Sequence, residues 1–303
     1  MKISTCIACG SNEVEKAGSY RPFALKGMKA SIKSFLVRHP WLMTCSRIKS
    51  LEKYRDFPVR GSLVRCRACA LVYLGTMPTL SQLERFYAAD YWSMRRPDMS
   101  PGQYRTSPRA HAQVEFITGL LPKPAISSVL EIGAGTATPS LLLREKLSPF
   151  GDVVINVIEP GSIWKDYYHQ TSINVIGTFF PIETDKTFSH IHASHWLEHN
   201  TDPKDTVQRM RRILDKNGTV FIEVPYASDE YWTYKLSDIP HTLFFSIESL
   251  NSLFTQSGFN VLGCGRYGIS LREWEQGRWP TDQEFARENP EGFWIRALYQ
   301  KEG

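Results

Sequence analysis

The sequence lacks a long apolar run: no stretch approaches the 18 uncharged apolar residues that a membrane-spanning helix needs. The first ten residues also lack the apolar segment of a secretory signal peptide. No internal repeat or low-complexity tract is found, and a content of 42% hydrophobic and 22% charged residues excludes disordered and collagen-like chains. We therefore expect a cytoplasmic globular protein with one substantial core and an accessory module.

Cysteine is scarce, and four of the six cysteines form two Cys-x-x-Cys pairs. In a reducing compartment such cysteines are more often metal ligands or buried thiols than disulfides. Each pair places two thiolates about one tetrahedral edge apart, so two pairs predict a closed structural zinc site. Cys45 and Cys264 remain, and we interpret them as buried thiols. The predicted zinc ligands are Cys6, Cys9, Cys66 and Cys69.

Acidic residues are almost missing from residues 16–67, where 13 Lys and Arg stand against Glu52 and Asp56. The local charge of +11 leaves −6 for the rest of a chain whose net charge is +5. Such a segment favours a polyanionic partner, although a solvated insertion is the alternative. Residues 26–55 also interleave cationic and large apolar side chains, which is typical of an element at an anionic membrane surface. A peripheral location at the inner face of the membrane would suit a lipid-carried substrate. RNA is a second partner class, without a recognised RNA-binding motif.

Three regions follow from the composition: a zinc-binding module with a basic insertion at 1–92, a turn-rich linker with one helix at 93–124, and an α/β domain at 125–303. Strand and helix signals alternate in the third region, which is the pattern of a doubly wound sheet. A final run at 293–299 is expected to return antiparallel at the sheet edge. Six strands and a returning seventh fit the methyltransferase variant of the Rossmann plan. The six strands are expected at 128–132, 153–158, 173–176, 190–194, 219–224 and 260–264.

A glycine-rich turn follows the first of these strands, where an open parallel sheet binds ligands. Gly133 and Gly135 let the backbone approach a cofactor closely. The third small residue of a dinucleotide fingerprint is replaced by Thr138, and Glu131 would repel a pyrophosphate but suits a cationic cofactor. Glu159 ends the second strand, where it can accept hydrogen bonds from both ribose hydroxyls. The pattern therefore favours S-adenosylmethionine (SAM) over a dinucleotide.

A series of motifs extends along nearly the whole chain: the two cysteine pairs with Phe86-Tyr87 and Tyr91-Trp92, Val129 to Gly135, Glu159-Pro160, His195 to His199, Asp202-Pro203, Gly218, Ile222 to Pro225, Pro240 to Ser246 and Ser257 to Phe259. With these motifs the sequence resembles the class I SAM-dependent methyltransferases. The cysteine pairs and the aromatic segment that follows them look like the zinc-binding domain of the deoxysugar C-methyltransferase-like branch. The resemblance implies a Rossmann-like seven-stranded sheet, SAM and zinc as cofactors, and a sugar-containing acceptor.

Three histidines are candidates for the site. His241 is our choice for the general base, because methyl transfer requires a positioned nucleophile that loses its proton and an imidazole titrates near neutrality. In the related sugar enzymes the loop after the fifth strand carries this base. His195 to His199 also reads as an inverted zinc-protease motif, but that motif needs one continuous helix and here a strand precedes it. The resemblance instead places His195 beside the cofactor and His199 beside the substrate.

The resemblance also suggests that Tyr87 and Tyr91 reach over the substrate, and Tyr91 is our third catalytic candidate. Pro240 precedes His241 where the sugar C-methyltransferases have Glu, which favours methylation of oxygen or nitrogen over carbon. We thus expect a SAM-dependent methyltransferase acting on a nucleotide sugar or a surface-polysaccharide or lipid-linked glycan precursor. The alternatives are an RNA methyltransferase that uses the basic segment and a non-catalytic zinc-stabilised binding module.

Overall fold

The computed structural model describes residues 5–20, 61–89, 102–121, 126–227, 231 and 241–303. Within this part of the chain, no helix is both long enough and apolar enough to cross a membrane. The basic segment at 26–55, Cys45 and Tyr91 lie outside the described residues.

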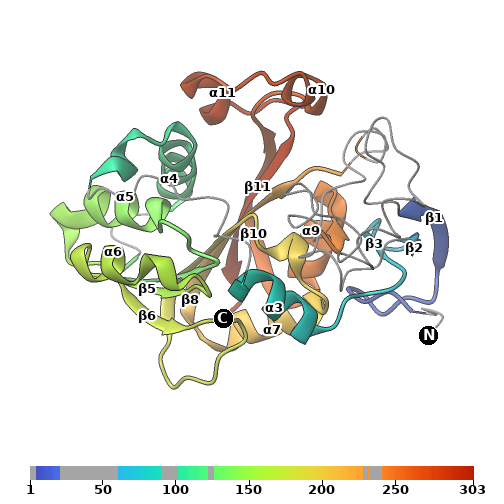
Figure 1. Ribbon diagram of the computed structural model, residues 1–303, viewed down its shortest axis with the longest axis horizontal. Helices are drawn as coiled ribbons and strands as arrows, with labels where there is room; N and C mark the ends of the chain where they lie inside the picture. Colours follow the sequence, from blue (N-terminus) through green and yellow to red (C-terminus); the bar gives the residue numbers. More distant parts are fainter. Residues whose placement is uncertain (1–4, 21–60, 90–101, 122–125, 228–230, 232–240) are drawn as a thin grey trace, which may run out of the picture.

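A seven-stranded sheet with the strand order β10-β11-β8-β7-β4-β5-β6 forms the centre of the molecule (Figure 1). Pairs from β8 through β6 are parallel, whereas β11 runs antiparallel to both of its neighbours. This is the Rossmann-like methyltransferase sheet that the sequence predicts. The strands are β4 (Ser128–Ile132), β5 (Val154–Ile158), β6 (Asn174–Gly177), β7 (Phe188–Ser194), β8 (Leu214–Pro225), β10 (Phe259–Tyr267) and β11 (Trp294–Lys301).

The prediction that the final run is an edge strand is wrong: β11 lies between β10 and β8, and β10 forms the edge. The residues of β11 from Trp294 to Tyr299 are all buried. An unbroken buried run of this kind requires a strand that is covered on both faces and paired on both sides. The apolar run was recognised in the sequence, but its consequence for strand order was missed.

Helices cover both faces of the sheet, because side chains alternate across each strand. Val129 of β4 packs into the apolar cluster of α4 and α5, whereas its neighbour Leu130 packs into the cluster of α7 and α9 on the other face. Figure 1 shows α4, α5 and α6 stacked on one side and α7 and α9 on the other. The helices are α4 (Pro108–Leu120), α5 (Thr138–Leu147), α6 (Lys165–Gln170), α7 (Pro203–Arg212), α9 (Ile247–Thr255), α10 (Leu271–Glu275) and α11 (Asp282–Ala286). In the part of the chain that the structure describes, the 3-10 turns are η3 (Gln103–Thr106), η4 (Ser148–Phe150), η5 (Ser162–Trp164) and η6 (Leu197–His199).

A second, four-stranded sheet has the order β1-β2-β3-β9 and combines distant parts of the chain. Its strands are β1 (Val14–Tyr20), β2 (Gly61–Cys66), β3 (Val72–Leu74) and β9 (Leu243–Phe244), and helix α3 (Leu80–Ala89) follows β3. Three strands come from the N-terminal part, whereas β9 begins two residues after His241 and pairs antiparallel with β3. Leu71 and Tyr73 share one apolar cluster with Leu130 and Leu197, so the N-terminal sheet and the large sheet have a continuous core.

Candidate active site

A cavity of about 710 Å³ opens at the carboxyl ends of β4, β5, β7 and β8. Strand ends of a parallel sheet meet at one edge, so residues far apart in the chain line the same space. The predicted residues Glu131, Gly133, Gly135 and Glu159 line this cavity, as do His195, His199 and His241. The structure thus brings together every predicted cofactor-binding residue and the two histidines predicted to be catalytic.

The glycine loop forms the tight bend that its sequence predicts. Gly133 and Gly135 have φ values of 69° and 52°, and Ala137 adopts a similar left-handed conformation at 49°. Glycine reaches this region without the steric cost that a Cβ imposes. At Gly133 a Cβ would also lie 2.8 Å from Cδ1 of Trp196, so this position excludes any side chain. Helix α5 begins directly after Ala137, which stands at the N-cap position of this helix.

Glu159 supports the same loop from the end of β5. Its Oε2 accepts a hydrogen bond from the Gly135 amide at 2.9 Å, and Oε1 accepts one from the Gly161 amide at 2.8 Å. The side chain is buried yet lines the cavity, as a role in binding ribose hydroxyls requires.

Glu131 lies at the end of β4 with only 4% of its surface exposed. Its Oε2 accepts a hydrogen bond from Ser140 Oγ of α5. Burial raises the pKa of the Glu131 carboxyl to about 8, because an ionised carboxylate loses its hydration there. A cationic ligand beside it would favour the ionised form, which agrees with the predicted preference for a positively charged cofactor.

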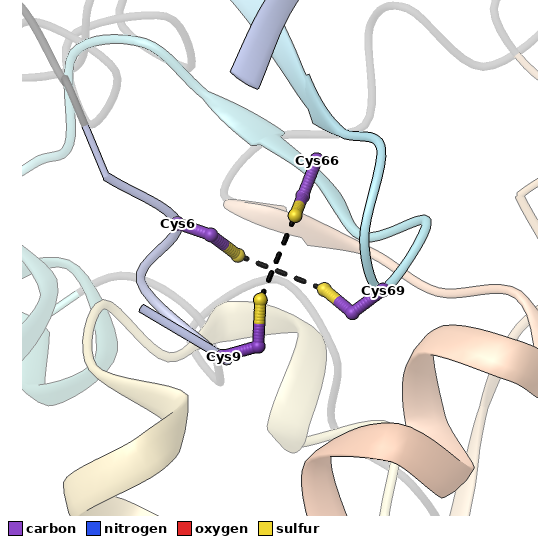
Figure 2. Close-up of side chains that lie close together, drawn as sticks. All are labelled: Cys6, Cys9, Cys66 and Cys69. Atoms are coloured by element: carbon purple, nitrogen blue, oxygen red, sulfur yellow. Dashed lines mark hydrogen bonds between the residues drawn. The ribbon is translucent and has the colours of Figure 1, made fainter. Parts of the chain in front are cut away.

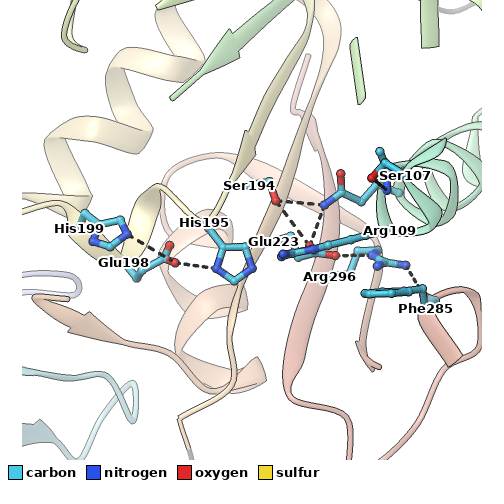
Figure 3. Close-up of polar contacts among 11 residues, drawn as sticks. Ser107, Arg109, Ser194, His195, Glu198, His199, Glu223, Phe285 and Arg296 are labelled. Atoms are coloured by element: carbon cyan, nitrogen blue, oxygen red, sulfur yellow. Dashed lines mark hydrogen bonds and ion pairs between the residues drawn. The ribbon is translucent and has the colours of Figure 1, made fainter. Parts of the chain in front are cut away.

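The segment after β7 brings two histidines to one carboxylate. His195 adopts φ 52°, and its Nδ1 lies 3.2 Å from Oε1 of Glu198. Nε2 of His199 lies 3.8 Å from the same oxygen, and Figure 3 shows Glu198 between the two rings. Glu198 and His199 belong to η6, a single short turn rather than a continuous helix, so the segment lacks the architecture of an inverted zinc protease.

His241 meets this segment from the loop before β9. Its ring lies 4.6 Å from the His199 ring, and its Nδ1 lies 3.0 Å from the hydroxyl of Tyr231. The amide of Thr242 donates to the Glu198 carbonyl at 2.9 Å, which ties the two loops together. Sequence reasoning found His241 and His199 but missed Tyr231, which follows β8 in a stretch without a recognisable motif.

Tyr87 reaches the cavity from α3, and its ring packs edge-on against His199 with the centroids 5.9 Å apart. The N-terminal part of the chain therefore contributes to the wall of the cavity, as the resemblance implies for this tyrosine. Tyr91, the other tyrosine of this prediction, lies outside the described residues.

A buried ion network beside the cavity was missed altogether. Glu223 of β8 is fully buried and accepts hydrogen bonds from the Nε atoms of Arg296 and Arg109, both at 2.7 Å (Figure 3). Burial raises the pKa of the Glu223 carboxyl, but the two guanidinium groups outweigh burial and hold it well below its usual range. Arg109 also lines the cavity, with its guanidinium 5.1 Å from the Trp294 ring centroid. Glu223 lies in a segment that carries the family resemblance, but Arg109 and Arg296 stand in other elements outside any recognised motif, so the sequence does not reveal this network.

The four predicted zinc ligands converge on one point in the N-terminal module (Figure 2). Sγ of Cys6 lies 3.6 Å from Sγ of Cys69, and Cys9 and Cys66 show the same separation. Zinc–sulfur bonds of about 2.3 Å imply a tetrahedral edge of about 3.8 Å, so the thiols suit a four-thiolate ion. A hydrogen bond from Cys69 lowers the pKa of Cys6 to about 5, and the same contact raises the pKa of Cys69.

Comparison with known proteins decides the family. The model of a family described as "Methyltransferase domain" matches residues 103–263, which is more than half of the chain. The chain belongs to this methyltransferase family. It is an enzyme that uses SAM as methyl donor, as the cavity and glycine loop indicate.

A solved structure of a complex between the Haloferax volcanii Trm112 methyltransferase activator and a methyltransferase supports the fold. The match has 14% identity and a TM-score of 0.50, and covers 64% of this chain and 90% of that chain. A SAM-dependent methyltransferase of Thermotoga maritima matches with 18% identity and a TM-score of 0.47, over 66% of this chain and 91% of that one. A curated protein of Dictyostelium discoideum, "Probable polyketide synthase 28", is 27% identical over 143 residues, which are 39% of this chain but 5% of that protein.

Proposed function

We propose that this methyltransferase methylates an oxygen or nitrogen atom of a sugar-containing acceptor, with His241 as the general base. The acceptor would be a nucleotide sugar or a surface-polysaccharide or lipid-linked glycan precursor. One observation carries the role of His241: the ring lies on the cavity wall and its Nδ1 is 3.0 Å from the Tyr231 hydroxyl. With Nδ1 held there, Nε2 is the ring nitrogen that we assign to take the proton of the acceptor.

SAM supplies, when bound, an electrophilic methyl group on a positively charged sulfur. The main contribution of the chain is to position the donor and the acceptor. Gly133 and Gly135 admit the donor close to the backbone, and Glu159 accepts hydrogen bonds from its ribose hydroxyls. On the acceptor, the bond to the methyl carbon forms as the sulfur–carbon bond breaks, and the O–H or N–H proton passes to His241. His199 and Tyr91 are assigned to orient the acceptor, and His195 to contact the donor.

Two features support a sugar-containing acceptor. The four-cysteine module and the His241 segment resemble those of the deoxysugar C-methyltransferase-like branch, and aromatic side chains on the cavity wall suit the apolar faces of a sugar ring. Pro240 stands where the sugar C-methyltransferases have Glu, which supports oxygen or nitrogen as the methylated atom. The aromatic residues on the cavity wall are Tyr87, Trp164, Phe179, Phe180, Trp196, Trp274, Phe293 and Trp294.

We also propose that Cys6, Cys9, Cys66 and Cys69 hold a structural zinc ion. Three of the four are buried, and they belong to the apolar cluster that joins the module to the large sheet. A closed four-thiolate ion would contribute folding energy rather than chemistry. The ion would lie among the four thiols, and none of these cysteines is among the residues that line the cavity.

The decisive experiment is a screen of nucleotide sugars and lipid-linked glycans with isotopically labelled SAM, read by mass spectrometry. His241→Gln should lower turnover on the best acceptor by about 100-fold or more, because a positioned base contributes that much. Calorimetry should show S-adenosylhomocysteine binding unchanged in this variant. His169→Gln, at an exposed position on α6, is the matched control and should keep normal turnover.

The outcomes separate the alternatives. Near-normal turnover of His241→Gln would remove the base assignment. Methylation of RNA instead of glycans, with steeply salt-dependent binding, would favour the RNA methyltransferase. Binding of S-adenosylhomocysteine without methylation of any nucleotide sugar or glycan would remove the sugar-containing acceptor from the proposal.

A further inference from the structure

Three potential metal ligands from two loops meet at the acceptor side of the cavity. Glu198, His199 and His241 each offer one ligand atom, and these atoms all lie within 4.8 Å of one another. Metal–nitrogen and metal–oxygen bonds of about 2.1 Å would require only a modest closing of the three side chains. Two imidazoles and one carboxylate form a donor set typical of Zn²⁺, Fe²⁺, Mn²⁺ and Co²⁺ sites that keep positions open for substrate.

The burial of Glu198 points independently to a cation. Its side chain is 2% exposed, and within the described residues neither carboxylate oxygen accepts a hydrogen bond. The near contacts are His195 Nδ1 at 3.2 Å and His199 Nε2 at 3.8 Å. A buried carboxylate that lacks hydrogen bonds is costly unless a positive charge compensates it.

Polar contacts from neighbouring residues hold the candidate ligands in place, as the outer shell of a metal site does. The Tyr231 hydroxyl lies 3.0 Å from Nδ1 of His241 and orients the ring. Thr242 donates to the Glu198 carbonyl through its amide at 2.9 Å and its hydroxyl at 3.1 Å, so the two ligand-bearing loops keep a constant distance. Such partners raise metal affinity by fixing ring orientation and backbone position.

We propose that Glu198, His199 and His241 bind a divalent transition-metal ion whose open positions take the nucleophilic oxygen or nitrogen of the acceptor. His199 and His241 line the cavity, so an ion bound to them would be accessible to the acceptor. A metal-bound hydroxyl loses its proton to water more readily, because the ion stabilises the alkoxide; the ion keeps its oxidation state throughout.

The catalytic role of the ion rests on the proposed methyl transfer. Binding of the ion does not depend on that proposal. In the ion-loaded protein, Nε2 of His241 is a ligand, and acidification of the acceptor by the ion takes the place of proton transfer to the ring. In the ion-free protein the ring acts as the base. The two roles of His241 exclude one another, so dependence of activity on the ion separates them.

The test uses the full-length protein with zinc retained at the four cysteines, titrated with Mn²⁺ and followed by electron paramagnetic resonance. Mn²⁺ prefers nitrogen and oxygen ligands and does not displace zinc from thiolates. We expect one bound Mn²⁺ per chain in the wild type, and binding weakened by about tenfold or more in Glu198→Gln and in His199→Gln. His169→Gln should bind like the wild type. Equal Mn²⁺ binding by wild type and both ligand variants would overturn the proposal.

Folding and function are checked separately. S-adenosylhomocysteine binding by calorimetry should be unchanged in the ligand variants, which shows that they fold. If Mn²⁺ binds as expected but no acceptor is methylated, the ion site stands and the proposed function fails. If methylation proceeds at an undiminished rate after the second ion is removed and zinc is retained, the catalytic role of the ion is refuted, while His241 keeps its role as base.

Discussion

Glu131 is the residue whose ionisation the fold alters most clearly in the cofactor cavity. Burial raises its pKa from an ordinary value near 4.5 to about 8, and Ser140 Oγ donates a hydrogen bond to it. Near neutral pH the carboxyl is therefore mostly protonated in the ligand-free protein, whereas in the unfolded chain it is ionised. A cationic donor would shift this balance towards the carboxylate.

A pH-dependent loss of stability follows from this residue. Because the folded pKa exceeds the unfolded one, the stabilisation is complete below pH 4.5 and is lost as the pH rises through about 8. Within that window Glu131 should lower the free energy of unfolding by about 1.4 kcal/mol per pH unit. Glu131→Gln cannot ionise, so its stability should fall less steeply than that of the wild type. Urea denaturation between pH 5 and pH 8.5 measures both slopes, and identical slopes would contradict the raised pKa.

Strand β9 is the element that connects the cysteine cluster with the candidate base. Tyr73 of β3 pairs with Leu243 of β9, and the Leu74 amide donates to the Thr242 carbonyl at 3.0 Å. His241 is the residue immediately before this junction. The position of the candidate base therefore depends on the N-terminal sheet, whose turns carry the four cysteines.

Loss of the four-cysteine site should consequently impair catalysis without abolishing donor binding. In Cys66→Ser we expect loss of zinc and methyl transfer reduced by about tenfold or more, because the His241 loop loses the sheet that supports it. Binding of S-adenosylhomocysteine should persist, since the glycine loop is held by Glu159 and α5 instead. Metal analysis and calorimetry measure the two effects, with Cys264→Ser as the control outside the cluster. Full activity of a zinc-free variant would disprove the coupling.

Charge is distributed unevenly along the whole molecule. Residues 16–67 carry +11, and the remainder carries −6. A basic segment attached to a mildly acidic body is attracted to anionic surfaces by its local charge rather than by the net charge of the protein. For a substrate on a lipid carrier, such attraction would bring the cavity close to the membrane surface.

We predict that the protein floats with liposomes that contain anionic lipid. Substitution of the Lys and Arg residues within 26–55 by Gln should abolish flotation, because each basic residue near an anionic surface contributes about 1 kcal/mol. Neutral liposomes are the control and should bind neither form. Failure of the wild type to float with anionic liposomes would end the membrane proposal.

Local sequence patterns were sufficient to predict most of the fold. The six predicted strands agree with β4 to β8 and β10 within a few residues, because each is a short apolar run bounded by turn formers. The glycine loop and the cysteine pairs were equally readable, since their chemistry depends on spacings of two or three residues. The position of β11 in the strand order was missed: this strand inserts between β8 and β10, in agreement with its burial on both faces.

The candidate site shows the same division between local and long-range information. The sequence alone was enough to single out Gly133, Glu159 and His241, each beside a strand end or in a family motif. Only the folded chain places Glu198, His199 and His241 together and sets Glu223 between two arginines. Between the separate segments, the contacts join residues that are 42 positions apart for His199 and His241, 73 for Glu223 and Arg296, and 114 for Glu223 and Arg109. They form because the sheet brings its strand ends to one edge, and no spacing along the chain encodes that meeting.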